Sequence, residues 1–138
     1  MTPPDHVTGL APRGELQQLL DSLLVPGGPR PIALVICDVV ALKFVNERDG
    51  FLAGDAVLAA AAATLRAAAT DTALLARLGG DELVAVFTGP AAPAAASRAA
   101  SSLAATVAPR LHAAAVIAEM MDTPGSLIDR LYATMRRS

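Results

Sequence analysis

The spacing of hydrophobic residues predicts a helix and then a strand near the start of the chain. Leucines stand at positions 16, 19, 20, 23 and 24, the i, i+3, i+4, i+7 spacing of an amphipathic helix. The Pro-Gly-Gly-Pro sequence at residues 26–29 ends this helix. Residues 32–37 are an apolar run rich in Ile and Val, which predicts a buried strand with Asp38 at its exit.

The middle of the chain predicts a second helix and a hairpin. Residues 46–54 are polar and contain glycine, and an alanine-rich helical pattern follows at about residues 55–69. Residues 74–87, LLARLGGDELVAVF, are two apolar runs separated by Gly79 and Gly80. This pattern predicts two strands joined by a tight turn, in which the glycines would supply positive φ angles.

The last third of the chain predicts a helix, a strand and a helix. Small residues dominate a predicted helix at residues 94–108, and residues 113–118 form a possible strand. Thr123 and Pro124 then cap a final amphipathic helix that ends in Arg136 and Arg137. Helix, strand, helix, strand, strand, helix, strand, helix is the resulting order. It predicts one α+β domain over residues 1–138, with helices on one or both faces of a mostly antiparallel sheet.

Composition narrows the classes of function. The 138 residues carry 11 basic and 13 acidic side chains, for a net charge of −2, and no basic run suits a nucleic-acid partner. Cys37 is the only cysteine, so an internal disulfide is impossible and a cytoplasmic location is expected. No run of about 20 leucine- or valine-rich residues indicates a membrane span. His6 and His112 lack partners at metal-binding spacing, which argues against a zinc site.

Three carboxylates are the candidates for chemistry. If the hairpin packs beside the strand at residues 32–37, Asp81 comes close to Asp38, with Glu82 next to it. Two unit charges about 4 Å apart repel by roughly 4 kcal/mol at an effective dielectric near 20, so such a cluster shares a proton or binds a cation. Oxygen ligands favour Mg²⁺ or Mn²⁺ and hence phosphoryl chemistry on a nucleoside triphosphate. A solvated hairpin end explains Asp81 and Glu82 equally well from spacing alone.

Four stretches in order add a family resemblance. They read DHVTGLAPRGEL at residues 5–16, DVVALKFVN at 38–46, DGFLAGD at 49–55 and RLGGDEL at 77–83. The first two resemble D-x-L-T-G-L-x-x-R-x-x-L and D-x-D-x-F-K-x-I-N, and the last resembles R-x-G-G-D-E-F. These are motifs of the GGDEF domains, the diguanylate cyclases that join two GTP molecules into cyclic di-GMP. The resemblance runs from one end of the chain to the other.

The resemblance implies a fold, a site and partners. The fold would be a palm-like, ferredoxin-related antiparallel sheet flanked by helices, an α/β sandwich. Mg²⁺ or Mn²⁺ would be held by Asp38, the Val39 carbonyl and Asp81. The catalytic turn would consist of Gly79, Gly80, Asp81 and Glu82. GTP would be bound by Leu42, Lys43, Asn46 and Asp55, of which Asn46 and Asp55 would read the guanine edge. Because two GTP molecules react across a two-fold axis, the active form would be a homodimer.

Several positions depart from the family pattern. Val40 stands for the second acid of D-x-D, Phe51 for a histidine, and Leu83 for the motif's phenylalanine. Met135 stands for the triphosphate-binding lysine, with Arg136 or Arg137 as possible substitutes. The product-inhibition motif R-x-x-D falls on residues 70–73 and is not present there, so inhibition by that route is not expected.

Three functions fit these features. The first is a working diguanylate cyclase, which the retained acids and glycines favour. The second is a degenerate domain that binds GTP or a protein partner without turnover, which Met135 suggests. The third is a related palm nucleotidyltransferase that makes a different cyclic dinucleotide, suggested by Phe51.

Overall fold

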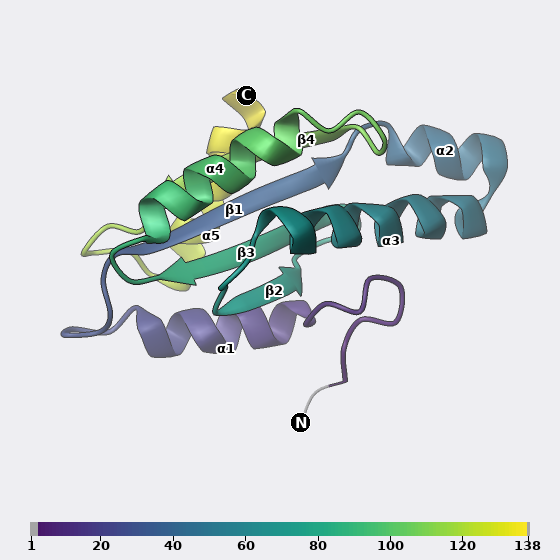
Figure 1. Ribbon diagram of the computed structural model, residues 1–138. Helices are drawn as coiled ribbons and strands as arrows, with labels where there is room; N and C mark the ends of the chain where they lie inside the picture. Colours follow the sequence, from purple (N-terminus) through teal and green to yellow (C-terminus); the bar gives the residue numbers. More distant parts are fainter. Residues whose placement is uncertain (1–2, 138) are drawn as a thin grey trace.

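The computed structural model describes residues 3–137 and contains five helices and four strands in that range. In chain order these are α1 (Arg13–Leu23), β1 (Ile32–Val39), α2 (Leu42–Asp49), α3 (Phe51–Ala68), β2 (Leu74–Arg77), β3 (Glu82–Thr88), α4 (Ala92–Ala104), β4 (Leu111–Ile117) and α5 (Pro124–Arg137). The four strands form one antiparallel sheet in the order β2-β3-β1-β4. Figure 1 shows helices on both faces of this sheet. The predicted α+β fold is confirmed.

The side chains of β1 alternate between two halves of the core. Ala33, Val35 and Cys37 face the layer made by α3 and α4, whereas Ile32, Leu34 and Ile36 face α1 and α5. All six side chains have 0% exposure, which explains why the strand reads as an uninterrupted apolar run. Burial also raises the pKa of the Cys37 thiol to about 12, so this cysteine serves as a small hydrophobic core residue.

The register of the sheet brings polar residues together at one end. Asp38, near the end of β1, lies opposite Glu82 at the start of β3 and opposite His112 in β4. Asp38 is thus the penultimate residue of β1 and not the residue after it, because the strand continues to Val39. Partners in an antiparallel register share a face of the sheet, so these three side chains project to the same side.

The predicted order has one helix between the first two strands, and the structure has two. Every residue of α2 keeps part of its surface exposed, so its sequence has no apolar stripe to reveal a helix. Gly50, with a φ of 92°, ends α2 and turns the chain into α3, which begins four residues before the predicted start near residue 55. Figure 1 shows α2 beyond the end of the sheet, where it packs beside α3.

Helix α3 is apolar, and one of its faces packs in the core. By length and composition alone it could cross a membrane, with a mean hydropathy of 1.4 over Phe51–Ala68. Its Leu58, Ala61 and Leu65, however, are at most 1% exposed and pack against the sheet. Since 28% of that window is buried, α3 packs one apolar face against the sheet and leaves the rest of its surface outside the core.

The boundaries of the last elements differ slightly from the prediction. Helix α4 begins at Ala92, and β4 starts at Leu111, two residues before the expected strand. The predicted cap of α5 is confirmed: the Ser126 amide donates to Thr123 Oγ1 at 3.1 Å, and the Thr123 amide donates to Ser126 Oγ at 2.9 Å.

Candidate active site at the end of the sheet

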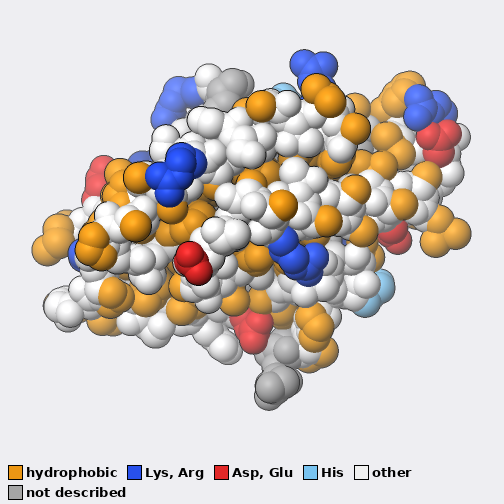
Figure 2. Space-filling model, viewed as in Figure 1, with side chains coloured by type: hydrophobic (Ala, Val, Ile, Leu, Met, Phe, Trp, Pro, Cys, Tyr) orange, Lys and Arg blue, Asp and Glu red, His pale blue; other side chains and the backbone are white. Residues whose placement is uncertain are grey.

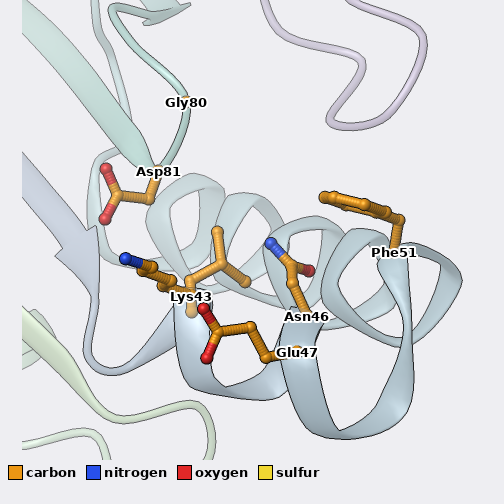
Figure 3. Close-up of a pocket in the computed structure, with 7 residues that line it drawn as sticks. Lys43, Asn46, Glu47, Phe51, Gly80 and Asp81 are labelled. Carbon is orange, nitrogen blue, oxygen red and sulfur yellow. The ribbon is translucent and has the colours of Figure 1, made fainter.

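A pocket of about 450 Å³ opens beside the start of β3. It is lined by Leu42, Lys43, Asn46, Glu47, Phe51, Gly80 and Asp81. Figure 3 shows Asp81 and Lys43 at one end, the Phe51 ring at the other, and Asn46 between them. The pocket thus unites five residues predicted to bind ligand or to form the catalytic turn, and it adds Glu47 and Phe51, for which no binding role was predicted. Because α2 was not predicted, the sequence offered no way to place Glu47 here.

Asn46 is positioned by a glycine on the neighbouring helix. A Cβ atom built on Gly54 of α3 would collide with Asn46 Oδ1 and lie 2.8 Å from Asn46 Cγ. The missing side chain at position 54 therefore creates the space in which the Asn46 amide lies. Asp55 follows Gly54, is half-buried, and lies outside the residues that line the pocket.

The turn before β3 depends on glycine for space. The prediction of positive φ angles at Gly79 and Gly80 is wrong, since glycines 9, 27, 50 and 89 are the ones described with positive φ. A Cβ on Gly79 would instead collide with Glu82 Oε1. The Leu78 amide donates to the Glu82 carbonyl at 2.8 Å, which closes the turn. Gly79 therefore leaves room for the Glu82 carboxylate, and a larger residue there would displace that side chain.

The two neighbouring acids of the turn have different surroundings. Asp81 lines the pocket with Lys43, whereas Glu82 Oε1 accepts a 2.8 Å hydrogen bond from the hydroxyl of Tyr132 in α5. Burial, together with the hydrogen bond to the Glu82 carboxylate, raises the pKa of Tyr132 to about 12. Asp81 is thus left facing the pocket while Glu82 is engaged with α5. The sequence did not indicate a partner for Tyr132.

Asp38 lies between a histidine and a second acid. Its Oδ1 atom is 3.1 Å from Nδ1 of His112. Burial raises the pKa of Asp38, the charge of Asp81 raises it further, and His112 acts in the opposite direction. The electrostatic effect of Asp81 agrees with the predicted approach of the two carboxylates. The His112 side chain is 58% exposed, and the sequence, which argued only against a zinc site there, did not reveal its contact with Asp38.

This donor set fits a divalent cation that is shared with a ligand. In the described part of the chain, no three side chains of His, Cys, Asp or Glu gather into a complete metal site. Mg²⁺ differs from many metals in this respect, because proteins commonly hold it by one or two carboxylates together with water and substrate phosphates. Asp38 and Asp81, two repelling carboxylates at the end of the sheet, match that arrangement.

Comparison with protein-family models identifies the family of the chain. The family model described as "Diguanylate cyclase, GGDEF domain" matches residues 3–123. The chain belongs to the GGDEF family.

Relatives and solved structures agree with this membership. The Mycobacterium tuberculosis protein Rv1354c is 42% identical over 89 residues, which are 64% of this chain and 14% of that protein. A signalling protein of Caulobacter vibrioides is 37% identical over 84 residues, 59% of this chain and 10% of that protein. The chain thus spans a small part of the length of these curated relatives.

Two solved GGDEF structures resemble the chain along nearly its whole length. A sensory box/GGDEF family protein from Caulobacter crescentus has a TM-score of 0.81 at 29% identity, covering 99% of this chain and 97% of that one. The GGDEF domain of DgcB from Caulobacter crescentus, solved in complex with c-di-GMP, has a TM-score of 0.84 at 21% identity. It covers 100% of this chain and 90% of that one and shows the shared fold.

The opening motif of this GGDEF domain braces the glycine turn. Asp5 Oδ2 accepts hydrogen bonds from the amide and the hydroxyl of Thr8, both at 2.8 Å, and Asp5 Oδ1 lies 3.0 Å from Arg77 Nη1. Arg77 in turn donates to the carbonyls of Gly79 at 3.2 Å and Gly80 at 2.7 Å. Burial works to raise the pKa of Asp5, yet Thr8 and Arg77 hold it below the ordinary value. The first motif therefore supports the shape of the last.

The basic side chains of this GGDEF domain lie at different places relative to the Gly79-Gly80 turn. Arg137 lines a hollow beside Ile117, at the opposite end of β4 from His112. Met135 packs against the core of the α1 and α5 face. Arg13, by contrast, lines a hollow of about 320 Å³ together with Arg77, Gly79 and Gly80.

Proposed function

We propose that this GGDEF domain is a diguanylate cyclase that condenses two GTP molecules into cyclic di-GMP. One observation carries the proposal. Asp81 lines a pocket that also contains a lysine and an amide side chain, and its charge raises the pKa of Asp38 at the same end of the sheet. Two carboxylates suit a divalent cation, the lysine suits a phosphate, and the amide suits a base edge.

The pocket suggests one orientation of the nucleotide. The triphosphate lies at the end formed by Lys43, Gly80 and Asp81, where positive charge and exposed backbone are available. The guanine lies toward Asn46, whose amide both donates and accepts hydrogen bonds, with Leu42 packing beside it. Asp55, on α3 next to Gly54, approaches the guanine when the nucleotide is bound.

Asp38, the Val39 carbonyl and Asp81 would hold Mg²⁺ or Mn²⁺. When bound, the metal neutralises triphosphate charge and lowers the pKa of the attacking 3′-hydroxyl. The Gly79 and Gly80 backbone approaches the phosphates, and Glu82, restrained by Tyr132, completes the catalytic turn. The 3′-oxygen of one GTP attacks the α-phosphorus of the other, and pyrophosphate leaves.

A complete reaction needs two copies of the domain. Each copy holds one GTP in a pocket that opens to solvent, and the product contains two phosphodiester bonds. A head-to-head homodimer brings the two pockets together and allows both bonds to form. Cytoplasmic GTP is the substrate, and neither nucleic acid nor a membrane takes part in the reaction.

A second candidate function follows from the missing phosphate ligand. Met135 packs against the core and Arg137 lies at the far end of β4, so the triphosphate has fewer cationic partners than the family pattern provides. A domain that binds GTP or a protein partner without turnover fits this feature. The altered residue at position 51 leaves a third function, synthesis of another cyclic dinucleotide.

One experiment separates these functions. The purified protein is incubated with GTP, with and without ATP, in Mg²⁺ or Mn²⁺, and the nucleotides are separated and weighed by mass spectrometry. Cyclic di-GMP is the expected product, and Asp81→Asn should abolish it while retaining the fold. GTP binding without product would establish the binding module, and a mixed cyclic dinucleotide would establish the third function.

A further inference from the structure

Phe51 is an exposed aromatic residue in the wall of the pocket. It is the first residue of α3, and 76% of its surface is exposed although it contacts the cavity. Leu52 next to it is 86% exposed, and Figure 2 shows hydrophobic side chains protruding at the end of the molecule where α2 meets α3. Aromatic side chains bury large apolar areas, so an exposed phenylalanine in a cavity wall offers a flat apolar surface to a bound ligand.

The pocket has a polar end and an aromatic end. Lys43 and Asp81 occupy the first, and Figure 3 shows the Phe51 ring at the second, with the Asn46 amide between them. A nucleotide has the same polarity, from charged phosphates to a flat base. Its phosphates belong with Lys43, which leaves the base at the end where the phenyl ring stands.

We propose that the Phe51 ring stacks on the face of the nucleotide base. The inference rests on the proposed function, since it concerns the same nucleotide pocket. Gly50 fixes the start of α3 and with it the position of the ring at the mouth of the pocket. Asn46 hydrogen-bonds to the edge of the base, whereas the Phe51 ring stacks on its face.

This division has a measurable consequence. Every base has a π-face, so stacking strengthens binding without regard to base identity. Loss of the Phe51 ring therefore weakens the binding of guanine and adenine nucleotides by the same factor. Loss of Asn46 changes the ratio between them, because hydrogen bonds to the edge distinguish the two bases.

Phe44 provides a matched control at the same end of the molecule. It is 58% exposed on α2, but it does not line the pocket, and its ring lies 5.3 Å from the Arg48 guanidinium. Removing this ring takes away the same chemical group without touching the cavity.

The test measures binding in the absence of turnover. Isothermal titration calorimetry with Mg²⁺ and the α,β-methylene analogues of GTP and ATP gives Kd values for wild type, Phe51→Ala, Phe51→Trp and Phe44→Ala. Phe51→Ala should weaken both analogues by roughly tenfold with an unchanged ratio. Phe51→Trp should retain affinity, and Phe44→Ala should match the wild type. Thermal melting checks that each variant is folded.

Two results would overturn the inference. Equal affinities for Phe51→Ala and wild type would exclude stacking while leaving the nucleotide pocket intact. A loss confined to the GTP analogue would assign Phe51 to the base edge instead. If the wild type bound neither analogue, the pocket itself would fail as a nucleotide site, and the proposed function would fail with it.

Discussion

The Tyr132 hydroxyl and Glu82 Oε1 are joined by a 2.8 Å hydrogen bond that links the last helix to the first residue of β3. The same carboxylate oxygen fills the space that a side chain at Gly79 would need. The hydrogen bond from Tyr132 thus holds the Glu82 carboxylate in the space beside Gly79. Removal of the hydroxyl releases the carboxylate without creating a cavity in the core.

Tyr132→Phe should reduce cyclase turnover while costing about 1 kcal/mol of unfolding free energy, the usual worth of one such hydrogen bond. The reason is that Glu82 loses the donor that holds it beside Gly79. Initial rates of cyclic di-GMP formation and urea unfolding measure the two effects. A variant with wild-type turnover would show that the orientation of Glu82 has no part in the reaction.

Gly54→Ala should separate stability from binding. Alanine is favoured over glycine in a helix by about 1 kcal/mol, so the free energy of unfolding should stay level or rise. The new Cβ atom should displace the Asn46 side chain from its place in the pocket, and GTP affinity should fall by about tenfold. Calorimetric titration and urea unfolding give both quantities.

Gly14→Ala is the matched control, because a Cβ atom on Gly14 in α1 meets nothing within 4 Å. It should gain stability without any change in GTP affinity. A Gly54→Ala protein that binds GTP as tightly as the wild type would mean that the position of Asn46 does not matter for recognition.

Asp122 should make stability depend on pH in the acid range. Hydrogen bonds from Arg130 lower the pKa of Asp122 from 3.8 to about 2, against the opposing effect of burial, and only 5% of its side chain is exposed. Because the folded-state pKa lies below the ordinary value, the ionised carboxylate stabilises the fold by roughly 2 kcal/mol at neutral pH. This contribution is lost as the pH falls from 3.8 towards 2.

The measurement compares urea unfolding of wild type and Asp122→Asn at pH 7 and at pH 2.5. The difference between the two proteins should be largest at pH 7 and should shrink at pH 2.5. Asp129→Asn, at an exposed position on α5, should follow the wild type at both values. A difference that stays constant with pH would contradict the role of the ion pair.

The regular elements were predictable because their burial is periodic. Leu16 and Leu20 are completely buried at the spacing that predicted α1, and the run at residues 32–37 is buried on both faces of β1. Helix α2 was missed because it packs at the end of the sheet and presents no apolar stripe. Local spacing thus predicts elements that cover the sheet, and fails for one that extends beyond it.

Side-chain contacts within the site were less predictable. The approach of Asp38 and Asp81 followed from pairing two strands, because register brings strand ends together. The contact between His112 and Asp38 joins residues 74 positions apart, and no local pattern marks it. The turn glycines were expected to supply positive φ angles, whereas Gly79 instead leaves room for the Glu82 side chain.

Asp5 and Arg77 are 72 positions apart, so their ion pair closes a long loop of chain. The entropic cost of that closure is met only when the intervening helices and strands are folded. The Arg77 guanidinium donates to the Gly79 and Gly80 carbonyls. It is held in place by Asp5 as well as by its own position in the hairpin. Partial unfolding at the start of the domain would therefore loosen the glycine turn even while the sheet beneath it remained paired.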